Sequence, residues 1–270
     1  MNSAGFDSVS DYAYLRLLVL RNDRATADLV EAMRSAGADP IVLKGAGTRE
    51  LLDLPTRPSS DIDLLVSPHQ RQVAERVLKG RGYRRTRGIH SDNWEHAEGA
   101  AVDLHRSLAR IGVSPAKCWA VLQGHTESLS LDGREVCVLD RPTRLVHLAI
   151  HATQDDTTRP GEDLQRALEL VERHDWRAAA EVAAELKVSA TVAWAIEQAG
   201  DCETAALFGR SRLAVNDTLE RGWAEFFRSA AHWTERLRRT ARLSENWVRW
   251  QAGRVVRLAN GSSAFYRRSN

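Results

Sequence analysis

Cysteine is scarce in this 270-residue chain, and its three cysteines lie far apart in the sequence. Cys118, Cys137 and Cys202 form no CxxC pair, and their odd number does not suit a disulfide framework. This usage argues against structural disulfides and a cysteine-type zinc site, and it favours a reduced cytoplasm. No apolar run approaches the ~18 residues that a membrane-spanning helix needs. The first residues also lack a basic region followed by an apolar one, so we expect no signal peptide.

Acidic and basic residues nearly balance, but the charge is unevenly distributed along the chain. The net charge is +2, whereas residues 221–270 hold eleven Arg and three Glu and carry +8, which leaves −6 for the rest. Such asymmetry indicates either an acidic partner for the C-terminal part or, more simply, an Arg-rich helix face that is solvated or pairs with the acidic body. The richness in Arg and Ala is typical of a bacterial protein from a GC-rich genome.

Hydrophobic periodicity divides the chain near residue 140. Residues 9–36 have helical spacing, strand-like segments follow at 41–45, 61–67 and 99–108, and an Asp-Gly turn joins two apolar arms at 131–140. After residue 140 strand-like alternation is largely absent, so helices are expected almost to the end. We therefore predict an α+β fold, with a mixed-sheet domain over residues 1–140 and an all-helical domain over residues 141–270.

Two carboxylates interrupt the apolar strand segment "DIDLLV". Side chains alternate between the faces of a strand, so Asp61 and Asp63 point the same way while Ile62 and Leu64 point into the core. Two carboxylates held this close repel each other, and a divalent cation would relieve the repulsion. Mg²⁺ prefers oxygen ligands and commonly takes one or two protein carboxylates together with water and substrate phosphates. The pattern therefore indicates a metal-nucleotide site, although a DxD alone is a weak signal.

Two neighbouring motifs strengthen this interpretation. In "VLKGAG" a strand runs into a glycine turn and then a helix, where backbone N–H groups can hold phosphate. In "AVDLH" the residue Asp103 alternates with apolar Val102 and Leu104 as Asp61 does with its neighbours. A third carboxylate on an adjacent strand would complete a two-metal site.

Together these motifs resemble the nucleotidyltransferase superfamily, the fold shared by DNA polymerase β and aminoglycoside nucleotidyltransferases. The segments "IVLKGAG", "RPSSDIDLLV" and "VDLH" are similar to a bacterial branch known as nucleotidyltransferase family proteins, whose members often accompany peptide natural-product clusters. The resemblance extends over about residues 22–199 and includes "EDLQRALELVERHDW" in the helical part. It implies a nucleotidyltransferase-type mixed sheet followed by helices.

The resemblance also implies residue roles. Asp61 and Asp63 would bind two Mg²⁺ ions, with Mn²⁺ as an alternative, and Asp103 would bind the catalytic ion and orient or deprotonate the acceptor hydroxyl. The implied nucleotide-binding residues lie before the acidic pair: Lys44, Gly45, Ala46, Arg57 and Ser60. A strand Lys44 could instead extend its ammonium to the surface, and Arg57 could pair with an acidic neighbour rather than a phosphate.

Three histidines and one tyrosine are weaker candidates. His105 lies on the same face as Asp103 and could contact phosphate or acceptor, or hold a neighbouring side chain in place. His147 and His151 are four residues apart, but "HLAIH" lacks the Glu of a zinc-protease helix, so two interfacial histidines are favoured over zinc. His151 coincides with a histidine that the branch often carries. Tyr83 lies in the basic segment "KGRGYRRTRG", where a helix-to-strand turn is favoured over base stacking.

The leading hypothesis is a Mg²⁺-dependent nucleotidyltransferase that acts on a nucleoside triphosphate and an acceptor, a peptide natural product or small molecule rather than RNA, with no membrane partner. Two departures from the superfamily pattern leave an alternative open: Ala46 replaces the usual serine, and residues 151–164 depart from the branch pattern. A degenerate module that binds nucleotide or peptide without chemistry fits these departures. An RNA-directed, toxin-like transferase is the third hypothesis, because of the basic segments at 79–87 and 221–270.

Overall fold

The structure is a computed structural model that describes residues 9–59, 61–86, 91–97, 99–153 and 158–209. The chain divides into two compact units, Met1–Leu219 and Glu220–Asn270, and all the described residues belong to the first unit. The Arg-rich segment 221–270, including its tryptophans, lies outside the described residues. The domain boundary near residue 140 therefore stays a prediction.

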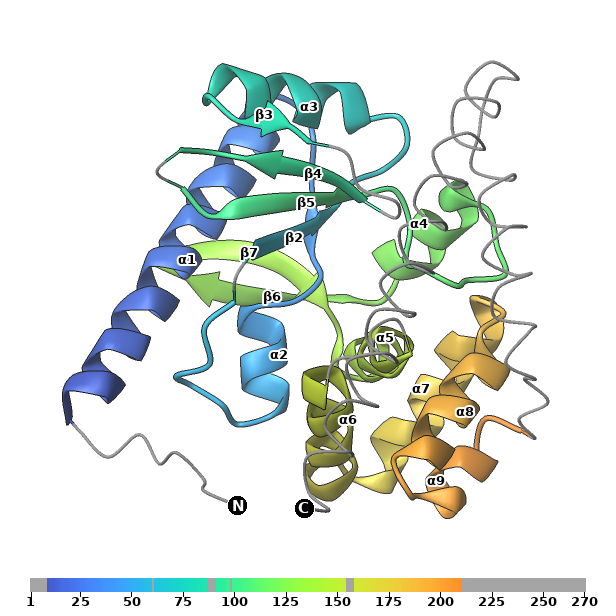
Figure 1. The fold of residues 1–270 in the computed structure, drawn as a ribbon. Coiled ribbons are helices and arrows are strands. Elements are labelled where there is room, and N and C mark those ends of the chain that lie inside the picture. The colour runs from blue at the N-terminus through green and yellow to red at the C-terminus, as the bar shows by residue number, and fades with distance from the viewer. Residues whose placement is uncertain (1–8, 60, 87–90, 98, 154–157, 210–270) are drawn as a thin grey trace, which may run out of the picture. The chain divides into compact units, whose positions relative to one another are not determined.

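The described part of the first unit is built on a seven-stranded mixed sheet with the order β3-β4-β5-β2-β1-β7-β6 (Figure 1). Strands β5 and β2 are parallel, as are β1 and β7, and the other neighbours are antiparallel. The strands are β1 (Ile41–Val42), β2 (Asp61–Leu65), β3 (Arg84–Arg85), β4 (Ser91–Glu95), β5 (Ala101–His105), β6 (Thr126–Leu131) and β7 (Arg134–Leu139).

The first four helices are interspersed with the strands along the sequence, and the other five follow the last strand. They are α1 (Val9–Ser35), α2 (Ala46–Leu51), α3 (Arg71–Gly80), α4 (Pro115–Gln123), α5 (Arg141–Ala152), α6 (Thr158–Leu170), α7 (Arg173–Glu185), α8 (Ser189–Gln198) and α9 (Cys202–Ala206). Side chains of Ser114, Asp140 and Asp201 accept hydrogen bonds from backbone N–H groups and so begin α4, α5 and α9. Among the described helices, none has the length and apolar character that crossing a membrane would require.

Two hydrophobic clusters lie against the sheet. One joins α1 and α3 to side chains such as Ile62 and Leu64 of β2 and Val102 of β5. The other joins α5, α6, α7 and α8 to Ile41 and Leu65. Because Leu65 lies two residues from Asp63, the second cluster occupies the sheet face that also carries the carboxylates. The α+β prediction, with a mixed sheet first and helices afterwards, is confirmed for the described residues.

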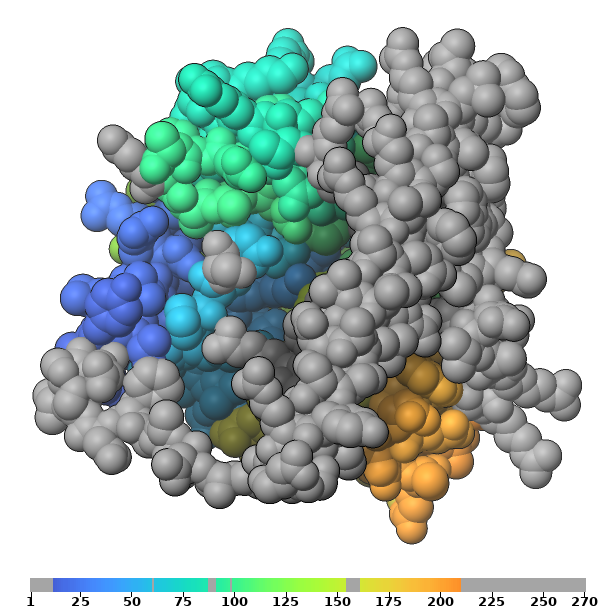
Figure 2. All heavy atoms as spheres, in the orientation of Figure 1, coloured from blue at the N-terminus to red at the C-terminus, as the bar shows by residue number. Residues whose placement is uncertain are grey.

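The first half of α1 contributes little to this core. Tyr14, Leu17 and Leu20 are spaced three residues apart and are all more than half exposed, whereas the buried residues of α1 begin at Val19. Figure 2 shows α1 in dark blue along one side of the visible face. The second half of α1 therefore supplies the side chains that pack against the sheet.

Most strand and turn predictions are confirmed, and one strand was missed. Asp132 and Gly133 both have positive φ angles (50° and 74°) in the turn between β6 and β7, as the Asp-Gly signal predicts. Gly82, at φ 85°, turns the chain from α3 into β3, which confirms the turn interpretation of "RGYRR", and the Tyr83 ring packs on the His96 ring. Strand β4 was not predicted, because "SDNWE" is mostly polar.

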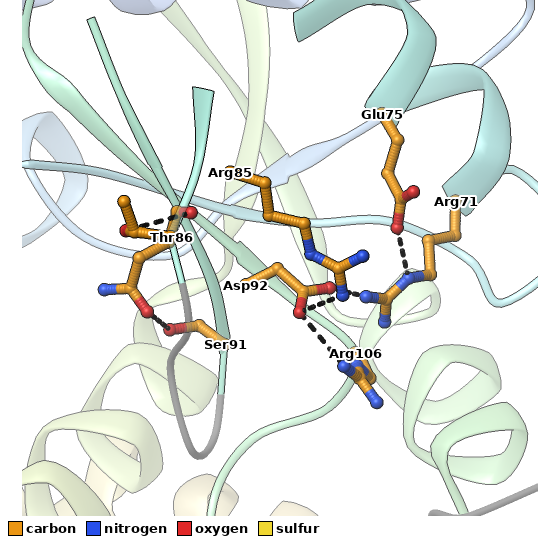
Figure 3. A network of polar contacts seen from close by, with 8 residues as sticks. Arg71, Glu75, Arg85, Thr86, Ser91, Asp92 and Arg106 are labelled. Atoms are coloured by element: carbon orange, nitrogen blue, oxygen red, sulfur yellow. Dashed lines mark hydrogen bonds and ion pairs between the residues drawn. The ribbon is translucent and has the colours of Figure 1, made fainter. Parts of the chain in front are cut away.

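The polar residue Asp92 of β4 explains why that strand belongs to the sheet. Asp92 is 4% exposed, and its carboxylate contacts the guanidinium groups of Arg71, Arg85 and Arg106 (Figure 3). The three arginines come from α3, β3 and the segment after β5, and Glu75 pairs with Arg71 at 2.9 Å. One carboxylate thus joins four elements on the sheet face opposite the candidate site.

Candidate functional site

The parallel register of β2 and β5 brings two of the predicted carboxylates together. Asp63 is the Cα partner of Asp103, and Asp61 is the partner of Ala101. Side-chain alternation then places Asp61, Asp63, Asp103 and His105 on one sheet face. The third carboxylate expected on an adjacent strand therefore lies directly opposite the second member of the DxD.

Asp63 lies at the centre of this group and is almost fully buried, with a side chain that is 1% exposed. Its Oδ1 accepts hydrogen bonds from His105 Nε2 at 2.8 Å and from Lys44 Nζ at 3.2 Å. Burial opposes the charged form, but the His105 hydrogen bond and the Lys44 ammonium outweigh it and hold the pKa of Asp63 below its usual range. Asp63 Oδ2 is buried and has no hydrogen-bond partner among the described residues.

The pKa of Asp103 is shifted in the opposite direction from that of Asp63. Burial raises the pKa of this carboxyl, and the neighbouring Asp63 and Asp61 carboxylates raise it further. His105 and a hydrogen bond from the side chain of Ser91 act against these effects without cancelling them. Two carboxylates with pKa values pushed apart are a recurrent feature of functional sites.

A pocket lies beside the acidic pair and contains most of the predicted nucleotide-binding residues. It is lined by Lys44, Gly45, Ala46, Ser59, Asp61 and Asp63, together with Asn22, Asp23 and Thr26 from α1 and Arg49 from α2. Gly45 has φ 69° and ψ −114° and turns the chain from β1 into α2. Because α2 has six residues, its dipole is small, and the pocket's charge comes mainly from side chains.

Of the remaining predicted residues, Arg57 and His151 are not among those that line this pocket. Arg57 Nη2 pairs with Asp163 Oδ2 of α6 at 2.5 Å, which is the acidic neighbour considered as its alternative role. Ser60 lies outside the described residues. His151 lies one turn from His147 on α5, with ring centroids 6.4 Å apart. Among the described residues, neither histidine belongs to a cluster of three or more ligating side chains with the geometry of a metal site.

The sequence identified His147 only as one of two interfacial histidines, and it did not identify Arg49 or Asp23. His147 is buried on α5, and burial, followed by the charges of Lys44 and His151, lowers its pKa well below its usual range. Arg49 of α2 holds Asp23 of α1 through one guanidinium nitrogen, at 2.5 and 2.6 Å from the two carboxylate oxygens. The Arg49–Asp23 pair has no local sequence signal, because its two members lie on different helices.

The donor set fits a divalent cation. Within the described residues, Asp63, Asp103 and His105 form a group whose ligand atoms lie within 4.8 Å of one another. Asp61 is on the same face, next to this group, and lines the pocket. A buried carboxylate oxygen without a partner is costly unless a ligand satisfies it, and Asp63 Oδ2 fits the role of a ligand to such a cation.

Comparisons with solved structures give distant similarities to nucleotidyltransferases. The solution structure of the antibiotic-resistance factor ANT(2'')-Ia is 17% identical over 65% of this chain and 97% of its own, with a TM-score of 0.44. An antigenic nucleotidyltransferase-like protein from Paracoccidioides brasiliensis is 16% identical over 66% and 91%, with a TM-score of 0.42. The crystal structure of ANT(2'')-Ia with adenylyl-2''-tobramycin is 15% identical over 69% and 98%, also with a TM-score of 0.42.

The family assignment does not depend on these distant similarities. No curated protein matches the chain. The model of the uncharacterised nucleotidyltransferase family, however, matches residues 12–202, which is more than half of the chain and includes all the carboxylates of the site. The chain therefore belongs to the uncharacterised nucleotidyltransferase family and is a nucleotidyltransferase.

Proposed function

We propose that this enzyme transfers a nucleoside monophosphate from a nucleoside triphosphate to a hydroxyl or phosphate oxygen of an acceptor, with Mg²⁺ as the metal and Mn²⁺ as an alternative. The observation that carries the proposal is the register that sets Asp63 opposite Asp103, with Asp61 on the same face. The orphaned Oδ2 of Asp63 supports a cation at that position. Divalent ions bound by these carboxylates would neutralise triphosphate charge and the charge that develops on the leaving group.

The proposed transfer forms one bond and breaks one. The acceptor oxygen attacks the α-phosphorus, the bond between the α-phosphorus and the bridging oxygen breaks, and pyrophosphate leaves with the bond electrons. When the acceptor group is a hydroxyl, its proton must be removed, and Asp103 is the proposed recipient. Its position opposite Asp63, at the edge of the proposed metal site, favours this role.

Two basic side chains are proposed to hold the triphosphate. Lys44 lines the pocket and keeps a partly exposed ammonium next to Asp63, from where it can reach a phosphate oxygen. Arg57 would offer a forked guanidinium to phosphate, in competition with Asp163. The backbone at Gly45 and Ala46 is proposed to approach the phosphates, because neither residue carries a long side chain.

For the acceptor we favour a modified peptide or small natural product, on the basis of the sequence resemblance to proteins that accompany peptide natural-product clusters. RNA is the alternative acceptor, and a nucleotide-binding module without turnover is the alternative function. Ala46, which takes the place of a serine hydroxyl, supports the latter. The proposed location is the cytoplasm, in keeping with the few and scattered cysteines.

The test is pyrophosphate release from each nucleoside triphosphate with Mg²⁺ or Mn²⁺ and a panel of peptide, small-molecule and RNA acceptors. Asp61→Asn and Asp63→Asn should remove the activity, whereas Asp132→Asn in the exposed hairpin turn should retain it. Equal rates in wild type and both site variants would refute the catalytic proposal. Nucleotide binding by calorimetry, without turnover on any acceptor, would favour the binding module.

A further inference from the structure

The two oxygens of the Asp63 carboxylate have different surroundings. Oδ1 accepts hydrogen bonds from His105 and Lys44, at 2.8 and 3.2 Å. Oδ2 is buried and has no hydrogen-bond partner among the described residues. A free carboxylate can exchange its two oxygens by rotation. Because both donors here bind Oδ1 and none binds Oδ2, the contacts hold the Asp63 carboxylate in one orientation.

The two donors approach Asp63 from opposite sides. His105 lies on β5, two residues beyond the register partner Asp103, so its imidazole reaches diagonally across to β2. Lys44 follows β1 on the other side of β2, where Leu43 N donates to Asp63 O at 3.0 Å. The pairing of β5 with β2 therefore fixes His105, whereas Lys44 lies in the short bend between β1 and α2, next to the Leu43–Asp63 backbone hydrogen bond.

From these contacts we infer that His105 is a positioning residue, which, with Lys44, holds Oδ1 so that Oδ2 alone is presented to the cation. The inference rests on the proposed metal site. Carboxylates that bind metals commonly need hydrogen bonds from neighbouring groups, and loss of such a neighbour typically lowers metal affinity about 10–100-fold. His105 is the more informative of the two donors, because the Lys44 ammonium would also repel a cation.

Direct ligation of the ion by His105 is the competing arrangement. The group formed by Asp63, Asp103 and His105 is compact enough for it. Ligation through Nε2 would remove the closest donor of Oδ1, whereas ligation through Nδ1 would leave the Nε2 hydrogen bond in place, so a test for metal-bound nitrogen is needed. The buried and unpartnered oxygen is Oδ2, and it is therefore Oδ2 that the structure leaves for the ion.

The experiment measures binding of Mn²⁺ alone, as a paramagnetic probe, by electron paramagnetic resonance. His105→Leu should weaken binding about 10–100-fold, because it removes the donor to Oδ1. His105→Gln should keep affinity close to that of wild type, because its amide nitrogen can lie near the position of Nε2 and donate. The matched control is His125→Leu, since His125 also contacts an aspartate, Asp140, at 3.2 Å but on another part of the fold.

Pulsed measurements on bound Mn²⁺ separate positioning from ligation. The wild type should show no directly coordinated nitrogen, and a nitrogen coupling that disappears in His105→Leu would overturn the inference. Equal Mn²⁺ affinity in wild type and His105→Leu would also overturn it. If His105→Leu fails to fold, His105→Gln decides, and a loss of affinity there would count against the inference. Unchanged binding in Asp63→Asn would instead refute the metal site itself, and with it the proposed function.

Discussion

Asp63 and Asp103 are direct register partners on the parallel strands β2 and β5, and their side chains lie on the same face of the sheet. Asp63 has two donors, His105 and Lys44, whereas Asp103 has a raised pKa caused first by burial and then by Asp63. The fold therefore stabilises the ionised form of Asp63 and disfavours the ionised form of Asp103, and such divergent carboxylates are common at sites that bind a cation or move a proton.

The first prediction is that Asp103→Asn stabilises the ligand-free protein while it removes activity. Ionised Asp103 is repelled by Asp63, so a neutral amide should raise the free energy of unfolding by about 0.5–1 kcal/mol. Nucleotidyl transfer should fall at least about 100-fold, because the amide is a poor base and a poor ligand. Urea unfolding without metal and a pyrophosphate assay with Mg²⁺ would measure the two effects.

The matched control for this prediction is Asp132→Asn, which changes an exposed carboxylate in the β6–β7 turn. It should leave activity unchanged, and stability should change by less than about 0.5 kcal/mol. If Asp103→Asn destabilised the protein as well as inactivating it, Asp103 would be a stabilising partner in the fold, and the interpretation of its raised pKa would be wrong.

The sequence was sufficient to predict the acidic strands, because their signals are local. Alternation in "DIDLLV" and "AVDLH" indicated which side chains share a face, and the glycine turn at Gly45 was visible between a strand and a helix. The register that makes Asp103 the partner of Asp63 follows from strand pairing. The family resemblance made this pairing an expectation, whereas periodicity within each strand contains no information about its partner's register.

The contacts that define the site's chemistry were not predictable, because they join elements that are distant in sequence. Lys44 was expected either to bind phosphate or to extend its ammonium to the surface, whereas in the structure it pairs with Asp63. Arg57 meets Asp163, more than 100 residues away. Strand β4 was missed because it contains the charged residue Asp92. Burying this carboxylate in the sheet is costly, and ion pairs with arginines from other elements offset the cost.

The second prediction concerns stability and the carboxylate of Asp92. Asp92→Asn would leave Arg71, Arg85 and Arg106 around a neutral group, so the free energy of unfolding should fall by about 2–3 kcal/mol. Arg85→Gln should cost less than about 1 kcal/mol, because Arg85 is 45% exposed and water screens its charge. Chemical unfolding measures both, and equal effects of the two variants would contradict the central role of Asp92.

The third prediction tests the backbone of the β1–α2 turn. Gly45 has φ 69° with ψ −114°, a conformation that residues with a Cβ rarely adopt, and nothing lies within 4 Å of an added Cβ. Gly45→Ala should therefore cost about 1–3 kcal/mol through backbone strain alone. Gly80→Ala in α3 also meets nothing within 4 Å but has no unusual φ, so it should leave stability unchanged or raise it by up to about 1 kcal/mol.

The fourth prediction is a pH dependence of stability that comes from His147. Burial lowers the pKa of this imidazole well below its usual range, and the charged or titratable groups that act on it are Lys44, His151, Asp63 and His105. In the unfolded chain a histidine has a pKa of about 6.5. The unfolded state therefore binds more protons below pH ~6.5, and the stability of the folded state falls as the pH falls, by up to about 1.4 kcal/mol per pH unit.

The measurement compares the free energy of unfolding of wild type and His147→Gln between pH 5 and pH 7.5. The substitution also changes packing at a buried position, so the difference in slope, rather than the absolute stability, is the readout. Asp63 and Asp103 are present in both proteins, so their own pH dependences largely cancel in the comparison. His69→Gln, at an exposed position, should leave the slope unchanged. A His147→Gln slope equal to that of wild type would mean that His147 takes up its proton equally in the folded and unfolded states, and would contradict its burial as a neutral group.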